Sequence, residues 1–147
     1  MQKGDRAVFL VWIELSAVLM IVGTYGAWVE VGPTGLAGTT AGARGWIVLA
    51  AALVAAGVAA FRRATRSAGA YVFALGVAAV VAAIYDRTHL AAIVGGGRIV
   101  SQAAGAGWGL YVALAASISL AIAGAVWVIA MAALPWAWLE PDASARR

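Results

Sequence analysis

One carboxylate stands out because it lies within an apolar run. Glu14 is the eighth residue of the segment that begins at Ala7, and a charge in the hydrocarbon of a bilayer costs about 2.5 to 3.5 kcal/mol on insertion scales. A carboxylate held there can bind a proton or a cation, which is the chemistry of proton-coupled transport. The alternative is a carboxylate that serves helix packing. At roughly 10 Å inside the membrane boundary, Glu14 is expected at the level of Trp127, whose indole N–H is the predicted donor, with Arg62 or Arg63 reaching toward it.

A second group of chemically capable residues follows the third apolar run. Asp86, Arg87 and His89 are close in sequence, and a histidine that changes charge near neutral pH would suit a pH-sensitive or ligand-binding corner. A hydrated helix end explains the same three residues. In the last apolar run, Ser117 and Ser119 could line a polar path, although serine in membrane helices more often bonds back to its own helix.

Several classes of chemistry are excluded by what the sequence lacks. The chain has no cysteine and one histidine, so a thiolate site and a multi-histidine metal site are both ruled out. The sequence shows no nucleotide-binding loop, nucleophile elbow or pair of carboxylates at catalytic spacing. We therefore expect no enzymatic activity and no cofactor. The net charge of +4 is spread over tails and loops, which argues against nucleic acid as a partner.

The elements that position these residues follow from composition. The 147 residues are 65% hydrophobic and 11% charged, with a mean hydropathy of +0.95, which is too apolar for a soluble domain of this size. A bilayer about 30 Å thick needs roughly 20 apolar residues as helix. The sequence therefore predicts an all-α integral membrane four-helix bundle, a single domain with Gly-rich outer loops and spans at about 7–29, 45–61, 68–85 and 108–134.

Charge and aromatic placement predict the orientation of these spans. Seven of the ten cationic residues fall on one side of the predicted bundle and only Arg44, Arg87 and Arg98 fall on the other. Because cytoplasmic loops carry the excess of Lys and Arg, both termini are expected in the cytoplasm of a multi-pass cell-membrane protein. Trp28 and Trp46 are expected in an aromatic belt at the outer interface.

Small residues predict how the helices approach one another, because close backbone contact drives association in lipid. The predicted packing faces contain Ala52 and Ala56; Ala74 and Ala78 with Gly76; and Ala113, Ser117, Ala121 and Gly124. The bulkier first span is expected to face lipid, another membrane protein or a second copy of the chain. Residues 98–101 alternate in polarity and could form a short strand that pairs with the first outer loop.

The glycines, aromatic residues and arginines at the ends of the predicted spans resemble those of small four-span membrane proteins from GC-rich, actinobacterial-type bacteria. This resemblance implies no activity. The residues that carry it are Trp28, Gly32, Gly35, Arg62, Arg63, Gly107, Gly109, Leu110 and Tyr111. Glu14 alone also resembles the first-helix glutamate of small multidrug resistance transporters, which exchanges protons for cationic drugs. This chain departs from those transporters in its longer outer loops and in the spacing of Val22, Gly23 and Thr24 after the glutamate.

These observations leave three hypotheses for function. The first is a non-enzymatic membrane subunit or interaction protein that packs through its Ala/Gly faces and its bulky first span. The second is a small proton-coupled transporter or channel component that uses Glu14. The third is a sensor built from the two Gly-rich outer loops. A transporter would lose activity on Glu14→Gln while folding normally, whereas an interaction protein would tolerate the change or lose its partner.

Overall fold

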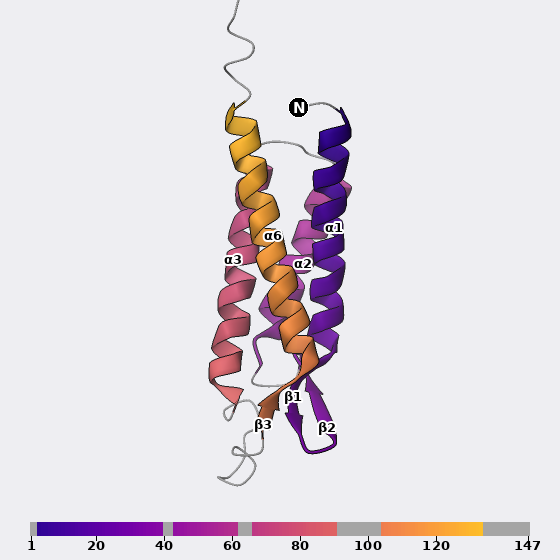
Figure 1. Cartoon of the computed structure of the whole chain (residues 1–147), viewed down its shortest axis with the longest axis vertical. Helices are drawn as coiled ribbons and strands as arrows, with labels where there is room; N and C mark the ends of the chain where they lie inside the picture. The colour runs from indigo at the N-terminus through magenta and orange to yellow at the C-terminus, as the bar shows by residue number, and fades with distance from the viewer. Residues whose placement is uncertain (1–2, 40–42, 62–65, 91–103, 134–147) are drawn as a thin grey trace, which may run out of the picture.

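Four helices and one small sheet make up the described part of the chain. The computed structural model describes residues 3–39, 43–61, 66–90 and 104–133 (Figure 1). In chain order its elements are α1 (Lys3–Tyr25), β1 (Ala27–Val31), β2 (Thr34–Ala37), α2 (Gly45–Ala60), α3 (Arg66–Thr88), β3 (Ala104–Ala106) and α6 (Trp108–Ala133). The sheet lies at one end of the helices, which we name the sheet end.

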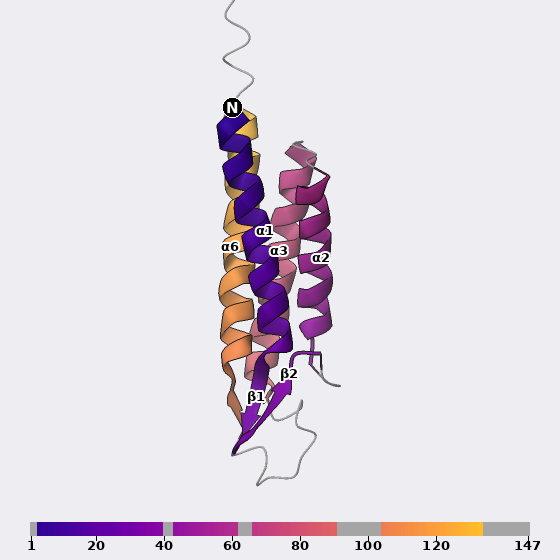
Figure 2. The same cartoon turned by 90° about the vertical axis from the view of Figure 1, so that its right-hand side faces the viewer.

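The helices form an antiparallel bundle in which each has two main neighbours. α1 packs against α2 and α6, and α3 packs against the same two helices from the other side. At the end opposite the sheet, α1 and α6 extend beyond α2 and α3, and the start of α1 lies near the end of α6 (Figures 1 and 2). The termini of the helical region therefore share one end of the molecule.

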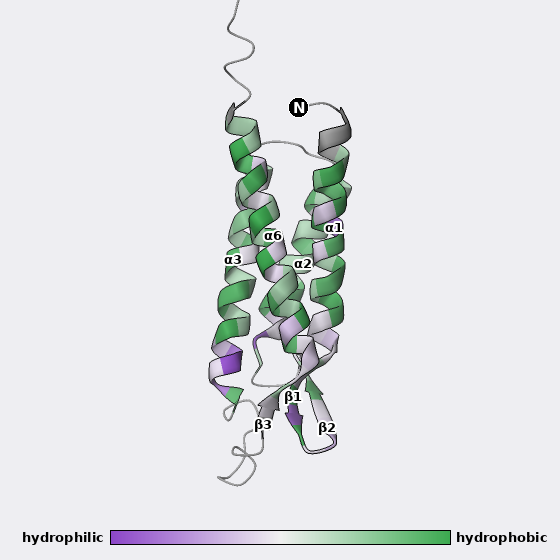
Figure 3. Ribbon diagram, viewed as in Figure 1, coloured by the Kyte–Doolittle hydropathy of each residue, from purple (hydrophilic) through white to green (hydrophobic). Residues whose placement is uncertain are grey.

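Three of the helices are long and apolar enough to cross a membrane. Their apolar stretches are Ala7–Tyr25, Ser67–Thr88 and Trp108–Ala132. α2 has 16 residues and so a length of about 24 Å, which is shorter than the roughly 30 Å of hydrocarbon in a typical bilayer. Apolar residues make up most of each helix, and polar residues gather toward the sheet end (Figure 3).

The first helix ends earlier than the predicted span at 7–29. It stops at Tyr25, and the chain turns at Gly26 into β1. A Cβ on Gly26 would lie 2.6 Å from the ring of Trp108, so the turn is closely packed against the start of α6. Trp28 then points into the molecule: it is fully buried, its ring lies against Gly38, and its Nε1 donates to the Gly23 carbonyl at 2.8 Å. Trp28 is thus a core residue and does not belong to an interfacial belt.

The sheet joins the two connections at this end of the bundle. Its strand order is β2-β1-β3, and both pairings are antiparallel. β1 and β2 are linked through Gly32 and Pro33, and Gly32 has φ +59°, a conformation that glycine adopts at the first central position of a tight hairpin turn. Residues 98–101, where the sequence suggested a strand, lie outside the described residues. The connection that contains them does pair with β1, through Ala104–Ala106.

Glycine and alanine make the closest helix contacts. A Cβ on Gly76 of α3 would lie 2.5 Å from the Ala121 nitrogen of α6, and one on Gly124 would lie 2.4 Å from the Phe73 nitrogen. Between α1 and α6, a Cβ on Gly23 would lie 2.5 Å from the Ala113 nitrogen. These contacts bring backbone against backbone, which gives many dispersion contacts between the helices.

The other predicted packing residues divide between the inside and the outside of the bundle. Ala52 is fully buried and Ala56 is half-buried, whereas Ala74 and Ala78 are exposed. The reason is helical geometry, since residues two apart lie on opposite sides of a helix. Gly76 faces α6, and its neighbours at plus and minus two therefore face outward. The buried face of α3 instead contains Val72, Gly76, Ala79 and Ala83.

Candidate functional site

Glu14 lies in the middle of α1 on the outside of the bundle. Its side chain is exposed, and the surrounding residues of the same face, Val11, Leu15 and Val18, are exposed and apolar. Within the part of the chain that the structure describes, no hydrogen bond or ion pair reaches its carboxylate. Arg62 and Arg63, which were expected to reach toward it, lie outside the described residues. The carboxylate thus occupies an apolar surface and not the bundle interior.

A hydrogen-bonded group of side chains fixes the level of Glu14 along the bundle. Trp12 donates from Nε1 to the Ser119 hydroxyl at 2.8 Å, and the hydroxyls of Ser16 and Ser119 are 3.0 Å apart. Because Trp12 and Ser16 flank Glu14 on α1, Glu14 is level with Ser119 of α6. It points the other way, since residues two apart are separated by about 200° around a helix.

Trp127 is eight residues beyond Ser119 on α6 and does not meet Glu14. It is buried, and its ring centroid lies 5.9 Å from that of Phe9, near the start of α1. Gly69 of α3 packs against another side of the Trp127 ring, because a Cβ on Gly69 would lie 2.9 Å from the indole. Among the described residues, its Nε1 is the one buried side-chain nitrogen or oxygen without a hydrogen-bond partner. The predicted pairing of Glu14 with Trp127 is therefore wrong.

The serines and threonine inside the bundle satisfy their own hydroxyl groups. Ser117 donates to the Ala113 carbonyl at 2.7 Å, and Thr24 donates to the Met20 carbonyl at 2.7 Å, each one turn back on its own helix. Ser119 differs because it links α6 to α1. Sequence reasoning missed Trp12 and Ser16 as its partners, since nothing in a single sequence pairs residues more than 100 positions apart.

At the sheet end, Asp86 and Arg44 form a second polar centre. Asp86 of α3 is fully buried and accepts the backbone N–H of Arg44 as well as a hydrogen bond from its Nη1, which is 3.3 Å from Oδ1. The Arg44 side chain is 42% exposed. Arg44 is the residue that directly precedes α2, so this ion pair joins the start of α2 to the end of α3. The carboxylate is held by two charge-assisted contacts from one residue.

Aromatic stacking extends this centre to His89. The Arg44 guanidinium lies 3.8 Å from the centroid of the Tyr85 ring, and the His89 ring stacks on Tyr85 at 4.0 Å with an interplanar angle of 9°. Two groups this close to one ring centroid must occupy opposite faces of the ring. His89 Nδ1 is also 2.9 Å from the Tyr85 carbonyl and from the Thr88 hydroxyl. The resulting stack of guanidinium, phenol and imidazole is a cation–π arrangement with a fixed geometry.

The predicted group of Asp86, Arg87 and His89 is split in three directions. Asp86 faces the interior, His89 lies on Tyr85, and Arg87 lies 5.7 Å from the centroid of Tyr111 on α6. Sequence reasoning missed Arg44 and Tyr85. The spacing of Tyr85 and His89, four residues apart on a helix, was a usable signal; the approach of Arg44 from 42 positions away was not. In the described residues, no group of three His, Cys, Asp or Glu side chains is close enough to hold a metal ion.

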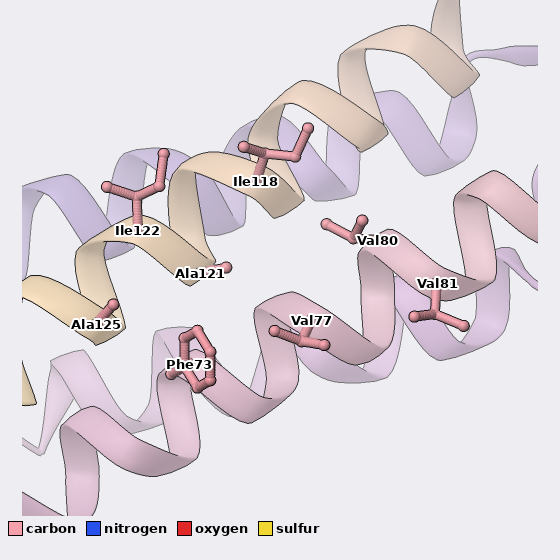
Figure 4. Close-up of a pocket in the computed structure, with 8 residues that line it drawn as sticks. All are labelled: Phe73, Val77, Val80, Val81, Ile118, Ala121, Ile122 and Ala125. Atoms are coloured by element: carbon pink, nitrogen blue, oxygen red, sulfur yellow. The ribbon is translucent and has the colours of Figure 1, made fainter.

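Two apolar grooves run along the outside of α3. One has a volume of about 300 Å³ and lies between α3 and α6, where side chains such as Phe73, Val77 and Ile122 line it (Figure 4). The other has a volume of about 370 Å³ and lies between α2 and α3. Its lining residues are Arg44, Ile47, Ala78, Val81, Ala82 and Tyr85. Of the two, the groove beside α2 is the one that ends at a cation.

Comparison of the chain with protein-family models, with curated proteins and with solved structures gives no match.

Proposed function

We propose that this protein is a non-enzymatic membrane subunit that crosses the bilayer four times and binds another membrane-embedded chain through the outer face of α1. The three long apolar helices support insertion into a membrane. α2, at about 24 Å, would complete a fourth crossing where the bilayer thins locally around it. Both termini are proposed to lie in the cytoplasm and the sheet outside, as the distribution of Lys and Arg favours.

The observation that carries the proposal is the position of Glu14. An ionisable side chain within a membrane span normally faces the bundle interior, a polar cavity or a partner. Glu14 faces none of these within the described chain, and apolar Val11, Leu15 and Val18 share its surface. The cost of about 2.5 to 3.5 kcal/mol for a charge at this depth is relieved when a donor from a second chain reaches the carboxylate. We therefore assign the α1 face to a partner that brings such a donor.

The glycine faces are already used inside the bundle, which leaves the outer surfaces for a partner. Gly23, Gly76 and Gly124 make backbone contacts between helices of the chain. The outer face of α1 presents large apolar side chains from Val8 to Tyr25, as do the outer faces of the other helices, and it differs from them in carrying Glu14. A partner helix packed along this surface would cover the carboxylate and the apolar residues together.

The test is recovery of the tagged protein from its native membrane in mild detergent, followed by measurement of the mass and composition of the complex. We expect a second chain at a fixed ratio, either a different membrane protein or another copy. Glu14→Gln should reduce its recovery about tenfold or more, because the amide cannot form an ion pair or a charge-assisted hydrogen bond. Glu30→Gln is the matched control, since Glu30 is an exposed carboxylate on β1. Recovery of the wild-type chain alone would refute the proposal.

The alternative is a small proton-coupled transporter that uses the same carboxylate. Glu14 lies near the middle of a span, as such a role requires, but it faces away from the hydrogen-bonded serines of the bundle. Reconstituted vesicles distinguish the two functions. A transporter would move protons or a cationic substrate in a Glu14-dependent manner, whereas a subunit would show no flux and would still bind its partner.

A further inference from the structure

The groove between α2 and α3 combines an apolar floor with one cation at its end. Ala78 and Ala82 leave space on α3, and the larger Ile47 and Val81 form the sides. Arg44 and Tyr85 close the groove at the sheet end. Ala78, which the sequence suggested for helix packing, faces outward, and its small side chain leaves a hollow on the surface of the bundle.

Arg44 has donors left to offer to a ligand at this position. A guanidinium carries five N–H donors. Within the described residues, the Arg44 guanidinium makes one hydrogen bond, from Nη1 to Asp86, and stacks on Tyr85. The ion pair and the stack fix the plane of the guanidinium, so little rotamer entropy is lost when a ligand binds. Planar, pre-oriented donors of this kind suit a phosphate group.

Exposed aromatic residues place Arg44 at the level of a membrane surface. Trp46 is two residues after Arg44 and is 60% exposed, and Trp108 and Tyr111 at the same end of α6 are also exposed. Trp and Tyr prefer the headgroup region of a bilayer. The groove therefore extends from the headgroup level, at Arg44, into the hydrocarbon, at Ala78.

We infer that this groove binds one glycerophospholipid, whose phosphate contacts Arg44 and whose acyl chain lies along Ile47, Ala78 and Val81. The inference rests on the proposed placement of the chain in a membrane but not on the partner at α1. The other groove, between α3 and α6, has only apolar lining residues. It gives a lipid no headgroup contact and serves as the internal comparison.

The experiment is native mass spectrometry of the delipidated, detergent-solubilised full chain, titrated with dioleoylphosphatidylglycerol. We expect one lipid per chain at low concentration. Dioleoylglycerol, which has the same acyl chains without the phosphate, should bind at least about tenfold more weakly, because a hydrogen bond to a charged group is lost.

Two variants test the two ends of the groove separately. Ala78→Phe fills the hollow without touching the ion pair, and Arg44→Gln combined with Asp86→Asn removes the cation without leaving a buried charge. Each should weaken binding about tenfold or more. Ala125→Phe, which fills the α3–α6 groove, is the matched control and should bind as the wild type does.

Three results would overturn the inference: equal binding of dioleoylglycerol, unchanged binding by Ala78→Phe, or complete displacement of the lipid by inorganic phosphate, which would indicate a site for phosphate alone. Glu14→Gln should leave lipid binding unchanged, and Ala78→Phe should leave the recovered complex unchanged. Failure of the lipid site is therefore distinguishable from failure of the proposed function.

Discussion

Asp86 and Arg44 depend on each other unequally, because one is buried and the other is partly exposed. The Asp86 side chain is 0% exposed and that of Arg44 is 42% exposed. Removing the arginine leaves a charged carboxylate without its counter-ion in a buried position, which is the costly way to break an ion pair. Removing the carboxylate leaves a guanidinium that water or lipid headgroups can solvate.

This asymmetry gives a prediction about stability. Arg44→Gln should lower the free energy of unfolding by about 3 kcal/mol, whereas Asp86→Asn should lower it by only about 1 kcal/mol, because the amide oxygen still accepts the Arg44 backbone N–H. Reversible unfolding in mixed detergent micelles measures both values. An equal loss of unfolding free energy in the two variants would mean that water reaches Asp86 as well as Arg44, contrary to the buried position of the carboxylate.

At this scale the sequence predicted which residues are chemically unusual but not what they contact. Glu14 and Asp86 were recognisable as carboxylates in or beside apolar runs. The expected partner of Glu14 was wrong, because the count placed the start of the first span at residue 7, level with residue 134 of the last. α1 begins four residues earlier, at Lys3, and its start lies near the end of α6 at Ala133, so Ser119 and not Trp127 is level with Glu14. Long-range approaches of this kind leave no trace in the spacing of a single sequence.

Between secondary-structure elements, the closest helix contacts depend on a few glycines, which have no side chain and so allow the two backbones to meet. Gly76 is such a position, since a Cβ there would lie 2.5 Å from the Ala121 nitrogen. Gly57 in α2 is the contrasting position, because a Cβ there would have no atom within 4 Å. The same substitution should therefore have opposite effects at the two sites.

We expect Gly76→Ala to destabilise the protein by about 2 kcal/mol, because α3 and α6 must separate to admit the methyl group. Gly57→Ala should be neutral or should stabilise by up to about 1 kcal/mol through helix propensity. Thermal unfolding of both variants in the same detergent gives the comparison. Equal stability of the two variants would show that α3 and α6 can separate to admit the methyl group without a loss in the free energy of unfolding.

The positions of the helices in the sequence were largely predictable, but the side of each helix that faces the bundle interior was not. Apolar run length indicated all four helices, with the start of α2 at Gly45 and of α6 at Trp108 as expected. The end of α1 was missed because Ala27, Trp28 and Val29 are as apolar as a membrane helix, although they form a buried strand. The outward position of Ala74 and Ala78 was missed because a helix rich in alanine has almost no amphipathic signal to give its rotation.

For the molecule as a whole, the sheet connects the α1–α2 half to the α3–α6 half. Glu30 of β1 and Gly105 of β3 are directly opposed, and opposed residues of antiparallel strands have Cα atoms about 4.5 to 5.5 Å apart. That separation suits a disulfide. The chain has no cysteine, so an introduced pair would have no competing thiol.

We predict that Glu30→Cys combined with Gly105→Cys forms an intramolecular disulfide in nearly all molecules under mild oxidation. Thr34→Cys combined with Gly105→Cys is the control: β2 and β3 lie on opposite sides of β1, which separates them by about 9 Å and exceeds the reach of a disulfide. Intact mass after alkylation counts the free thiols. Ready cross-linking of the control pair would contradict the strand order.

The composition predicted a helical chain with apolar helices, and three helices of the described chain are long and apolar enough to cross a membrane. The sheet was not predictable, because its strands are short and one of them, Ala104–Ala106, has no side chain larger than a methyl group. Strands of this composition carry no alternating pattern. Their pairing depends on the bundle, which brings the two connections to the same end.

The central position of β1 also sets the order in which the chain can finish folding. β1 can pair with β2 as soon as the first hairpin exists, but its other edge stays open until Ala104–Ala106 has reached the sheet end of the bundle. An open edge exposes unpaired backbone groups that other strands can bind. Closure of the sheet therefore requires that α2 and α3 have already carried the chain away from the sheet end and back to it, and a chain interrupted before residue 104 would keep an open strand edge that quality-control proteases could recognise.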